Sequence, residues 1–318
     1  MTAPLVLLGY AILVATAGSR CLQRAEWPQR SPRLGILLWQ ALAASVVVSV
    51  VLAGAALALP ALPVTTSVAE FLEACAMALR EHYATPGGAA LSFVGAFVVI
   101  AVVGRVTYFL AVVLSKGRRE RAVQRRSLAL VAGRDLGSGA LVVEYATPAV
   151  YCLPGRGREV VFTSAALAAL DAGQVDAVLA HEWAHLRGRH DLVLAAAGAL
   201  QAAFPFISFF AVARAELARL VEMHADDTAV GDRDRLLLAT ALVTLAEGTA
   251  PPGTLGAGGA SAVARVRRLA QPALPLGRPG SLFAAIGTGA VLVVPILIAA
   301  APAVAAAAMD YCPVGFPS

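Results

Sequence analysis

Four apolar stretches, each near the length of a membrane-spanning helix, constrain this chain more than any other feature of its sequence. A transmembrane helix needs roughly 20 mostly apolar residues. Hydrophobic residues make up 59% of the 318 residues and charged residues only 14%, whereas a soluble domain carries about 25% charge. One globule cannot bury so much apolar surface, so we expect spans at residues 4–18, 34–59, 89–114 and 282–308.

The charges between the spans predict how the chain is oriented. Loops rich in Lys and Arg stay on the cytoplasmic side of a membrane. Basic residues follow the first and the third span, at Arg20, Arg24, Arg30, Arg33, Lys116, Arg118, Arg119, Arg121, Arg125 and Arg126. The 61–88 loop holds three Glu against one Arg. We therefore expect both termini outside and the segment after the third span in the cytoplasm.

The chain is expected to divide into three parts. Residues 1–115 hold three transmembrane helices, 116–280 form a cytoplasmic domain, and 281–318 form the fourth helix with a short outer tail. Because most basic residues flank apolar runs, the net charge of +5 indicates a bilayer rather than direct nucleic-acid binding. Cys75 and Cys312 both fall outside in this topology, where a disulfide or two free thiols are equally compatible with the sequence.

The cytoplasmic segment mixes strand and helix patterns. Short β-like runs occur at 128–131 and 140–144, and two further strands, 150–153 and 159–163, flank a Pro-Gly turn and predict a β-hairpin. Ser164 is expected to cap a short helix. Asp171 with Gln174 resembles a capping box, which predicts a helix over 172–190.

That helix carries the motif with the most chemical content, His181-Glu182-Trp-Ala-His185. Residues four apart lie on one face of a helix, so the two imidazoles can bind one metal ion. Glu182 lies beside that face, where a general base acts on water in metalloproteases. The spacing predicts a zinc peptidase site; the alternative is a solvated helix face with chance spacing.

A catalytic zinc site needs a third protein ligand, and Glu222-Met-His-Ala-Asp226 supplies one. We expect Glu222 as that ligand and Asp226 as a hydrogen-bond partner of a ligand imidazole, which raises ligand basicity. His190 and His224 are not expected to be ligands, because helical spacing turns them away from the site. Arg265, Arg267 and Arg268 are candidates for stabilising an oxyanion, although solvated side chains are the simpler interpretation.

An apolar run between these motifs has a restricted path. Both motifs must reach one ion, so the chain crosses the membrane zero or two times between them. Only 30 residues separate Asp191 from Glu222, and two spans need roughly 40. The sequence therefore predicts a membrane-dipping helical hairpin at about 192–213, kinked near Pro205.

Taken in order, several motifs resemble a known family. They are Tyr151-Cys-Leu-Pro-Gly155, Val161-Phe-Thr-Ser164, Val178-Leu-Ala-His-Glu-Trp-Ala-His185, Arg187 to His190, and Glu222-Met-His-Ala-Asp226. The chain resembles the membrane metallopeptidase module of BlaR/MecR-type sensor transducers and, more distantly, HtpX-type and CAAX-prenyl-type membrane proteases. The resemblance implies a gluzincin-type zinc peptidase domain and cleavage leading to loss of a BlaI/MecI-like repressor. BlaR/MecR-type sensors carry a penicillin-binding domain after the last span, whereas about ten residues follow Ala308 here, which puts β-lactam sensing in doubt.

The sequence thus predicts a mainly α-helical membrane protein with four transmembrane helices and a cytoplasmic α+β gluzincin-type zinc peptidase domain holding one zinc ion. The expected activity is endopeptidase cleavage of a protein substrate at the cytoplasmic face. Substrate is expected to extend along an edge strand near Val150, Tyr151, Val161 and Thr163. Alternatives are a quality-control protease and a non-catalytic metal-binding sensor. A homodimer is left open.

Overall fold

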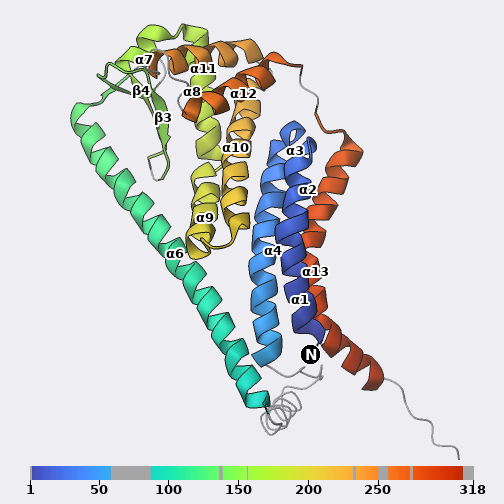
Figure 1. Cartoon of the computed structure of the whole chain (residues 1–318). Helices are drawn as coiled ribbons and strands as arrows, with labels where there is room; N and C mark the ends of the chain where they lie inside the picture. The colour runs from blue at the N-terminus through green and yellow to red at the C-terminus, as the bar shows by residue number, and fades with distance from the viewer. Residues whose placement is uncertain are drawn as a thin grey trace, which may run out of the picture. The chain divides into compact units, whose positions relative to one another are not determined.

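The computed structural model describes residues 2–58, 87–135, 139–155, 157–231, 234–249, 257–272 and 275–310, with their secondary structure (Figure 1). Cys75 and Cys312 lie outside these residues. The chain divides into two compact units. One comprises Met1–Arg24, Leu37–Tyr108 and Leu282–Ser318, and the other Ala25–Ile36 and Phe109–Ser281.

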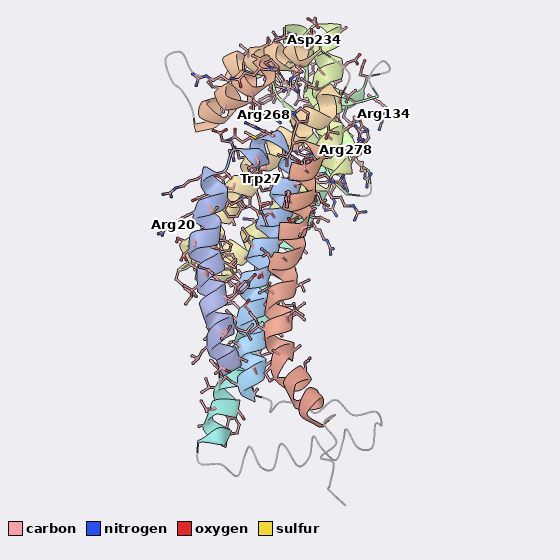
Figure 2. All side chains as sticks on the ribbon, turned by 90° about the vertical axis from the view of Figure 1, so that its right-hand side faces the viewer. Arg20, Trp27, Arg134, Asp234, Arg268 and Arg278 are labelled. Atoms are coloured by element: carbon pink, nitrogen blue, oxygen red, sulfur yellow. The ribbon has the colours of Figure 1, made fainter. Side chains whose placement is uncertain are left out.

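Four helices among the described residues are long and apolar enough to cross a membrane: Thr2–Arg24, Pro32–Ala58, Gly88–Val131 and Arg278–Val304. The first combines α1 (Thr2–Leu13), a π-helical turn η1 (Val14–Gly18) and α2 (Ser19–Arg24). The others belong to α4 (Pro32–Ala58), α6 (Gly88–Val131) and α13 (Arg278–Asp310). Side chains along α4 and α13 are mostly carbon in Figure 2. These helices are consistent with a membrane protein.

Two side-chain hydrogen bonds link helices of the first unit next to a proline in α13. Pro295 has no N–H, so the carbonyl of Val291, four residues earlier, loses its helical partner. Two hydroxyls from other helices replace it: Tyr10 Oη lies 2.9 Å and Ser45 Oγ 2.8 Å from that oxygen. The backbone acceptor freed by Pro295 is thus satisfied by side chains of two other helices, as an apolar surrounding requires.

The second unit contains a four-stranded sheet in the order β1-β2-β4-β3. The strands are β1 (Gly133–Arg134), β2 (Leu141–Val143), β3 (Val150–Leu153) and β4 (Glu159–Thr163). The predicted hairpin is confirmed, because β3 and β4 pair antiparallel. However, β4 also pairs in parallel with β2, so Val161 and Thr163 are not on an edge strand. Residues 128–131, read as β-like, form the end of α6, because the helix continues through the basic stretch.

The helices of the second unit are α3 (Trp27–Arg30), α7 (Ser164–Ala169), α8 (Ala172–Arg187), α9 (His190–Ala203), α10 (Ser208–Val230), α11 (Arg235–Thr249) and α12 (Ala257–Ala270). The capping box is confirmed at α8: Gln174 N donates to Asp171 Oδ1 at 2.8 Å, and Asp171 N donates to Gln174 Oε1 at 3.1 Å. Thr163, rather than Ser164, caps α7 through its hydroxyl.

The apolar run after α8 forms a helical hairpin. Helix α9 ends at Ala203 and α10 begins at Ser208, with Pro205 in the turn between them. Proline cannot donate the hydrogen bond that would continue α9. Arg214 Nη1 of α10 donates to Gln201 Oε1 of α9 at 2.9 Å, which ties the two arms together.

A buried cluster of apolar side chains fixes the helices that carry the polar motifs. Phe162 of β4, Val178 of α8, Leu238 of α11 and Leu269 of α12 all belong to it and are nearly inaccessible to solvent. Burial of a large apolar side chain contributes about 1.5–3 kcal/mol. The cluster therefore joins α8 and α12 to one core, with α11 packed against both helices, although α8 and α12 are far apart in the sequence.

Candidate metal centre

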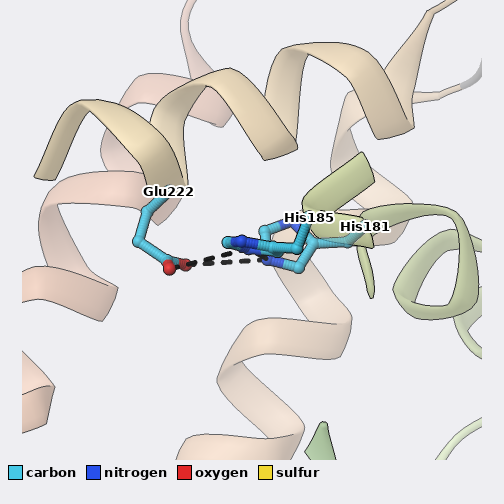
Figure 3. Close-up of side chains that lie close together, drawn as sticks. All are labelled: His181, His185 and Glu222. Carbon is cyan, nitrogen blue, oxygen red and sulfur yellow. Dashed lines mark hydrogen bonds and ion pairs between the residues drawn. The ribbon is translucent and has the colours of Figure 1, made fainter. Parts of the chain in front are cut away.

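Two helices bring three metal-binding side chains to one point. His181 and His185 lie one turn apart on α8, and Glu222 faces them from α10 (Figure 3). The two Nε2 atoms are 3.1 Å apart. Each of them lies 3.6 Å from a carboxylate oxygen of Glu222. Among the described residues this is the group of three whose ligand atoms all lie within 4.8 Å of one another.

These separations fit a tetrahedral ion. Donor atoms about 2.0–2.1 Å from zinc and separated by a tetrahedral angle lie about 3.3 Å from each other. The observed 3.1 Å and 3.6 Å bracket that value. Two imidazoles and one carboxylate are also the donor set of one class of catalytic zinc sites, in which the fourth position stays open. The three side chains could therefore hold one zinc ion.

Asp226 lies behind the first of these histidines. Its side chain is completely buried, and its Oδ1 is 3.1 Å from Nδ1 of His181. Burial alone would lower the pKa of His181, but the contacts with Asp226 and Glu222 outweigh it and raise that pKa to about 9. We expected Asp226 to form a hydrogen bond with one of the candidate ligand imidazoles. The structure places Asp226 next to the His181 imidazole, although the contact lacks the alignment of a hydrogen bond.

Arg265 closes the same cluster from α12. Its Nε donates to Asp226 Oδ2 at 2.9 Å, its Nη2 donates to Oδ1, and its Nη1 lies 3.0 Å from Glu222 Oε2. Sequence reasoning favoured a solvated side chain here, which is wrong for Arg265, since only 13% of the side chain is exposed. Burial of Asp226 would raise the pKa of that carboxyl, but the guanidinium outweighs burial, and the pKa falls to about 2.

The two other arginines of α12 lie elsewhere. Arg268 Nη2 contacts Asp227 Oδ2 at 2.6 Å and donates to the carbonyl of Gln29 at 3.0 Å, and Figure 2 labels this side chain. Arg267 is exposed. Asp227 is a partly exposed partner in this ion pair. Of the three candidate oxyanion donors, the structure brings only Arg265 to the metal-binding group.

Glu182 is mostly buried beside the two histidines. Burial raises the pKa of its carboxyl. Its neighbour from β3 is Cys152, to which the sequence analysis assigns no role. Burial, together with the negative charge and hydrogen bond of Glu182, raises the pKa of the Cys152 thiol. The thiol therefore stays protonated beside the Glu182 carboxylate. This contact depends on the packing of β3 against α8, which the sequence does not show.

His190 contacts the second histidine of the motif. Its Nδ1 lies 3.1 Å from Nδ1 of His185, and the side chain is buried. The expectation that helical spacing turns His190 to the opposite face is wrong, because α8 ends at Arg187 and Arg189 adopts a left-handed conformation with φ 49°. His190 then opens α9. Burial lowers the pKa of His185 and of His190 to about 4 each, and His224 lies beyond them, outside the ligand group.

A cleft of about 370 Å³ opens onto this cluster. One wall is the edge strand β3, with Val150, Tyr151 and Cys152, and the opposite wall is apolar, with Leu238, Leu242 and Leu245 of α11. Glu182, His181, His185, Glu222 and Arg265 form its polar end. An extended chain lying in the cleft would therefore pass the general-base candidate and the ligand group.

Comparison with known proteins agrees with this chemistry. The model of peptidase family M48 matches residues 117–269, a stretch that contains every residue of the cluster. The match indicates metallopeptidase activity, and it supports a membrane-type zinc metallopeptidase. It does not distinguish the BlaR/MecR type from related branches. No curated protein and no solved structure matches the chain.

Proposed function

We propose that this chain is a membrane-embedded zinc metalloendopeptidase that cleaves a protein substrate at the cytoplasmic face. The observation that carries the proposal is the convergence of His181, His185 and Glu222 on one point, with Glu182 beside them in an open cleft. In this assignment the first three side chains are the metal ligands, Glu182 is catalytic, and Asp226 supports His181. The peptidase domain is residues 116–280.

The three ligand side chains and Glu182 together support peptide hydrolysis as the reaction. A zinc ion, when bound, supplies a Lewis acid that polarises a peptide carbonyl and lowers the pKa of water toward neutrality. Glu182 takes a proton from the attacking water and passes it to the leaving amine. Burial raises the pKa of Glu182, which makes its carboxylate a stronger base than an exposed one. The protonated thiol of Cys152 lines the same cleft and can donate a hydrogen bond to that carboxylate.

Substrate binding is assigned to the outer edge of β3. This strand is terminal in the sheet, so its outward N–H and C=O groups are free of ladder partners on one side and can pair with an extended peptide. Of the candidate positions on an edge strand, Val150 and Tyr151 remain. Because β3 also lines the cleft, a peptide added to it runs directly past Glu182.

Topology and substrate identity complete the proposal. The basic loops support a topology with the peptidase domain in the cytoplasm and both termini outside, and in this topology residues 192–213 dip into the membrane as a hairpin. The resemblance to BlaR/MecR-type transducers favours a BlaI/MecI-like repressor as substrate. A quality-control protease acting on damaged membrane proteins is the alternative, and it shares the same site.

The test of catalysis is Glu182→Gln in the full-length chain, purified in detergent. We expect this variant to bind one zinc ion per chain, measured by elemental analysis, and to lose cleavage of a denatured protein substrate. The matched control is Glu144→Gln, an exposed carboxylate outside the cleft, which should cleave normally. Full activity in Glu182→Gln would remove Glu182 as the base, and a wild-type chain that binds zinc without any cleavage would favour a non-catalytic sensor.

Comparative proteomics on cells producing the wild-type chain or Glu182→Gln then separates the two protease roles. A repressor fragment that disappears in the variant supports regulated proteolysis. Accumulation of many damaged membrane proteins instead supports quality control.

A further inference from the structure

The second metal-ligand candidate has an unusual partner. His181 has the carboxylate of Asp226 behind its Nδ1 atom, whereas His185 has a second imidazole there. The Nδ1 atoms of His185 and His190 lie 3.1 Å apart, and only 3% of His190 is exposed. The ring planes are nearly perpendicular, at 89°. Thus the two ligand candidates rest on chemically different supports.

Metal binding determines which of the two rings, His185 or His190, donates the hydrogen bond between their Nδ1 atoms. His185 points its Nε2 atom at the ligand group, 3.6 Å from Glu222 Oε1. A neutral imidazole carries one N–H, so an Nε2 lone pair that is free for a metal requires the proton on Nδ1. That proton needs an acceptor in a buried place, because an unsatisfied buried donor costs about 1–3 kcal/mol. The neighbouring Nδ1 of His190 is the acceptor within reach.

We propose that His190 is a positioning residue whose Nδ1 atom accepts a hydrogen bond from the Nδ1–H group of His185. This hydrogen bond fixes the tautomer and the ring orientation in which His185 binds the metal. The inference rests on the metal site of the proposed function. His190 then carries its own proton on Nε2. Partners of this kind commonly change metal affinity by 10- to 100-fold when they are removed.

The glycine two residues before His190 leaves space for the His190 ring. Gly188 ends α8 with helical φ and ψ angles, so its conformation does not require glycine. A Cβ at this position would, however, overlap the Nε2 end of the His190 ring. Left-handed Arg189 turns the chain so that the first residue of α9 folds back onto His185. Gly188 and Arg189 together therefore place His190 under the ligand.

The test compares His190→Asn with His190→Gln in the full-length chain. The Oδ1 atom of Asn can take the place of the His Nδ1 atom as an acceptor, whereas the longer Gln side chain places its amide nearer the Nε2 position. The zinc dissociation constant is measured by competition with a chromophoric chelator. The visible absorption of the cobalt-substituted chain reports the ligand geometry.

We expect His190→Gln and His190→Ala to weaken zinc binding 10- to 100-fold and to change the cobalt spectrum, whereas His190→Asn stays within a few-fold of the wild type. His224→Ala removes a ring whose centroid lies 5.5 Å from that of His190, at a tilted angle, and should leave both readouts unchanged. Equal zinc affinities for the Asn and Gln variants would overturn the proposal, because a merely space-filling role does not distinguish them.

Failure of this inference is separable from failure of the proposed function. A wild-type chain that cleaves protein while His190→Gln binds zinc normally keeps the peptidase assignment and rejects the positioning role. Conversely, a weakened zinc site in His190→Gln, in a chain that never cleaves protein, keeps the positioning role and rejects the peptidase.

Discussion

The guanidinium of Arg265 and the carboxylate of Asp226 form a two-point ion pair in the interior, although they lie 39 residues apart in the sequence. Asp226 is fully buried, and it also faces His181. The fully buried Asp226 and the partly exposed Glu222 therefore share a single guanidinium. Charged groups in such places are tolerated only when they are paired and hydrogen-bonded, so α12 is a structural part of the candidate metal centre.

Removal of that guanidinium is expected to destabilise the peptidase domain. Arg265→Met leaves the fully buried carboxylate of Asp226 without its cation, and loss of one partner of a buried pair costs about 3–5 kcal/mol. The measurement is thermal or urea unfolding of the purified chain without added metal. Arg268→Met on the same helix is the matched control, because its partner Asp227 is 31% exposed and should cost less. Equal losses in the two variants would contradict the special role of Arg265.

Metal removal is expected to lower the stability of the same domain. The ligand group is formed only in the folded chain, because it combines residues of two helices. A ligand that binds only the folded state at 100 times its dissociation constant contributes about 2.7 kcal/mol. A chelator should therefore lower the melting temperature, and added zinc should restore it. The same treatment of His185→Ala should produce no shift, and a shift as large as that of the wild type would place the metal elsewhere.

The edge of β3 offers a test of substrate docking. Thr163 N donates to the carbonyl of Ala149, and residues 151 and 161 form the next equivalent pair. By the alternation of an antiparallel ladder, the N–H of Val150 points outward from the sheet. Val150→Pro removes that donor without removing a bond inside the hairpin, since proline is tolerated on sheet edges.

We expect Val150→Pro to lower kcat/KM by about five- to tenfold, the equivalent of one hydrogen bond of about 1 kcal/mol. Val150→Ala keeps the N–H and serves as the control for the lost side chain. Steady-state cleavage of a fluorogenic peptide supplies the numbers. If the alanine variant loses as much as the proline variant, the side chain rather than the backbone edge contacts substrate.

The carbonyl of Val291 gives a prediction for the helical unit. Ser45→Ala removes one of the two hydroxyls that satisfy it, and hydrogen bonds between membrane helices contribute about 0.6 kcal/mol, with a maximum near 1.7. Pro295→Ala returns the helical N–H to this oxygen. The loss in Ser45→Ala should therefore shrink in the double variant, which a double-mutant cycle of thermal stability in detergent measures. Strict additivity would show that the hydroxyl and the proline are not linked.

Much of the local structure was accessible from the sequence, because it depends on neighbours within one element. A spacing of four residues, close to one helical turn, put His181 and His185 on one face. The Asp171–Gln174 box began the helix where the pattern predicted, and Pro205 broke the apolar run into a hairpin. Four long apolar helices followed from composition alone. Each of these features needs only the spacing of residue types along the chain.

Other features were decided by tertiary packing. The position of β4 between β2 and β3 depends on a parallel pairing that no hairpin pattern encodes. Arg265 reached the cluster because Leu269 anchors α12 in the same core as α8, and Cys152 met Glu182 because β3 packs beside the motif helix. The predicted orientation of His190 was wrong because the left-handed residue Arg189 interrupts the helical periodicity between α8 and α9.

The sequence by itself determined which side chains can bind a metal and activate water, since those roles follow from residue chemistry and from a periodicity of about 3.6. Only the tertiary structure decided which groups support them. The partners of His181, His185 and Glu182 come from α10, α9 and β3, and the burial that makes these contacts matter exists only once those elements have packed together.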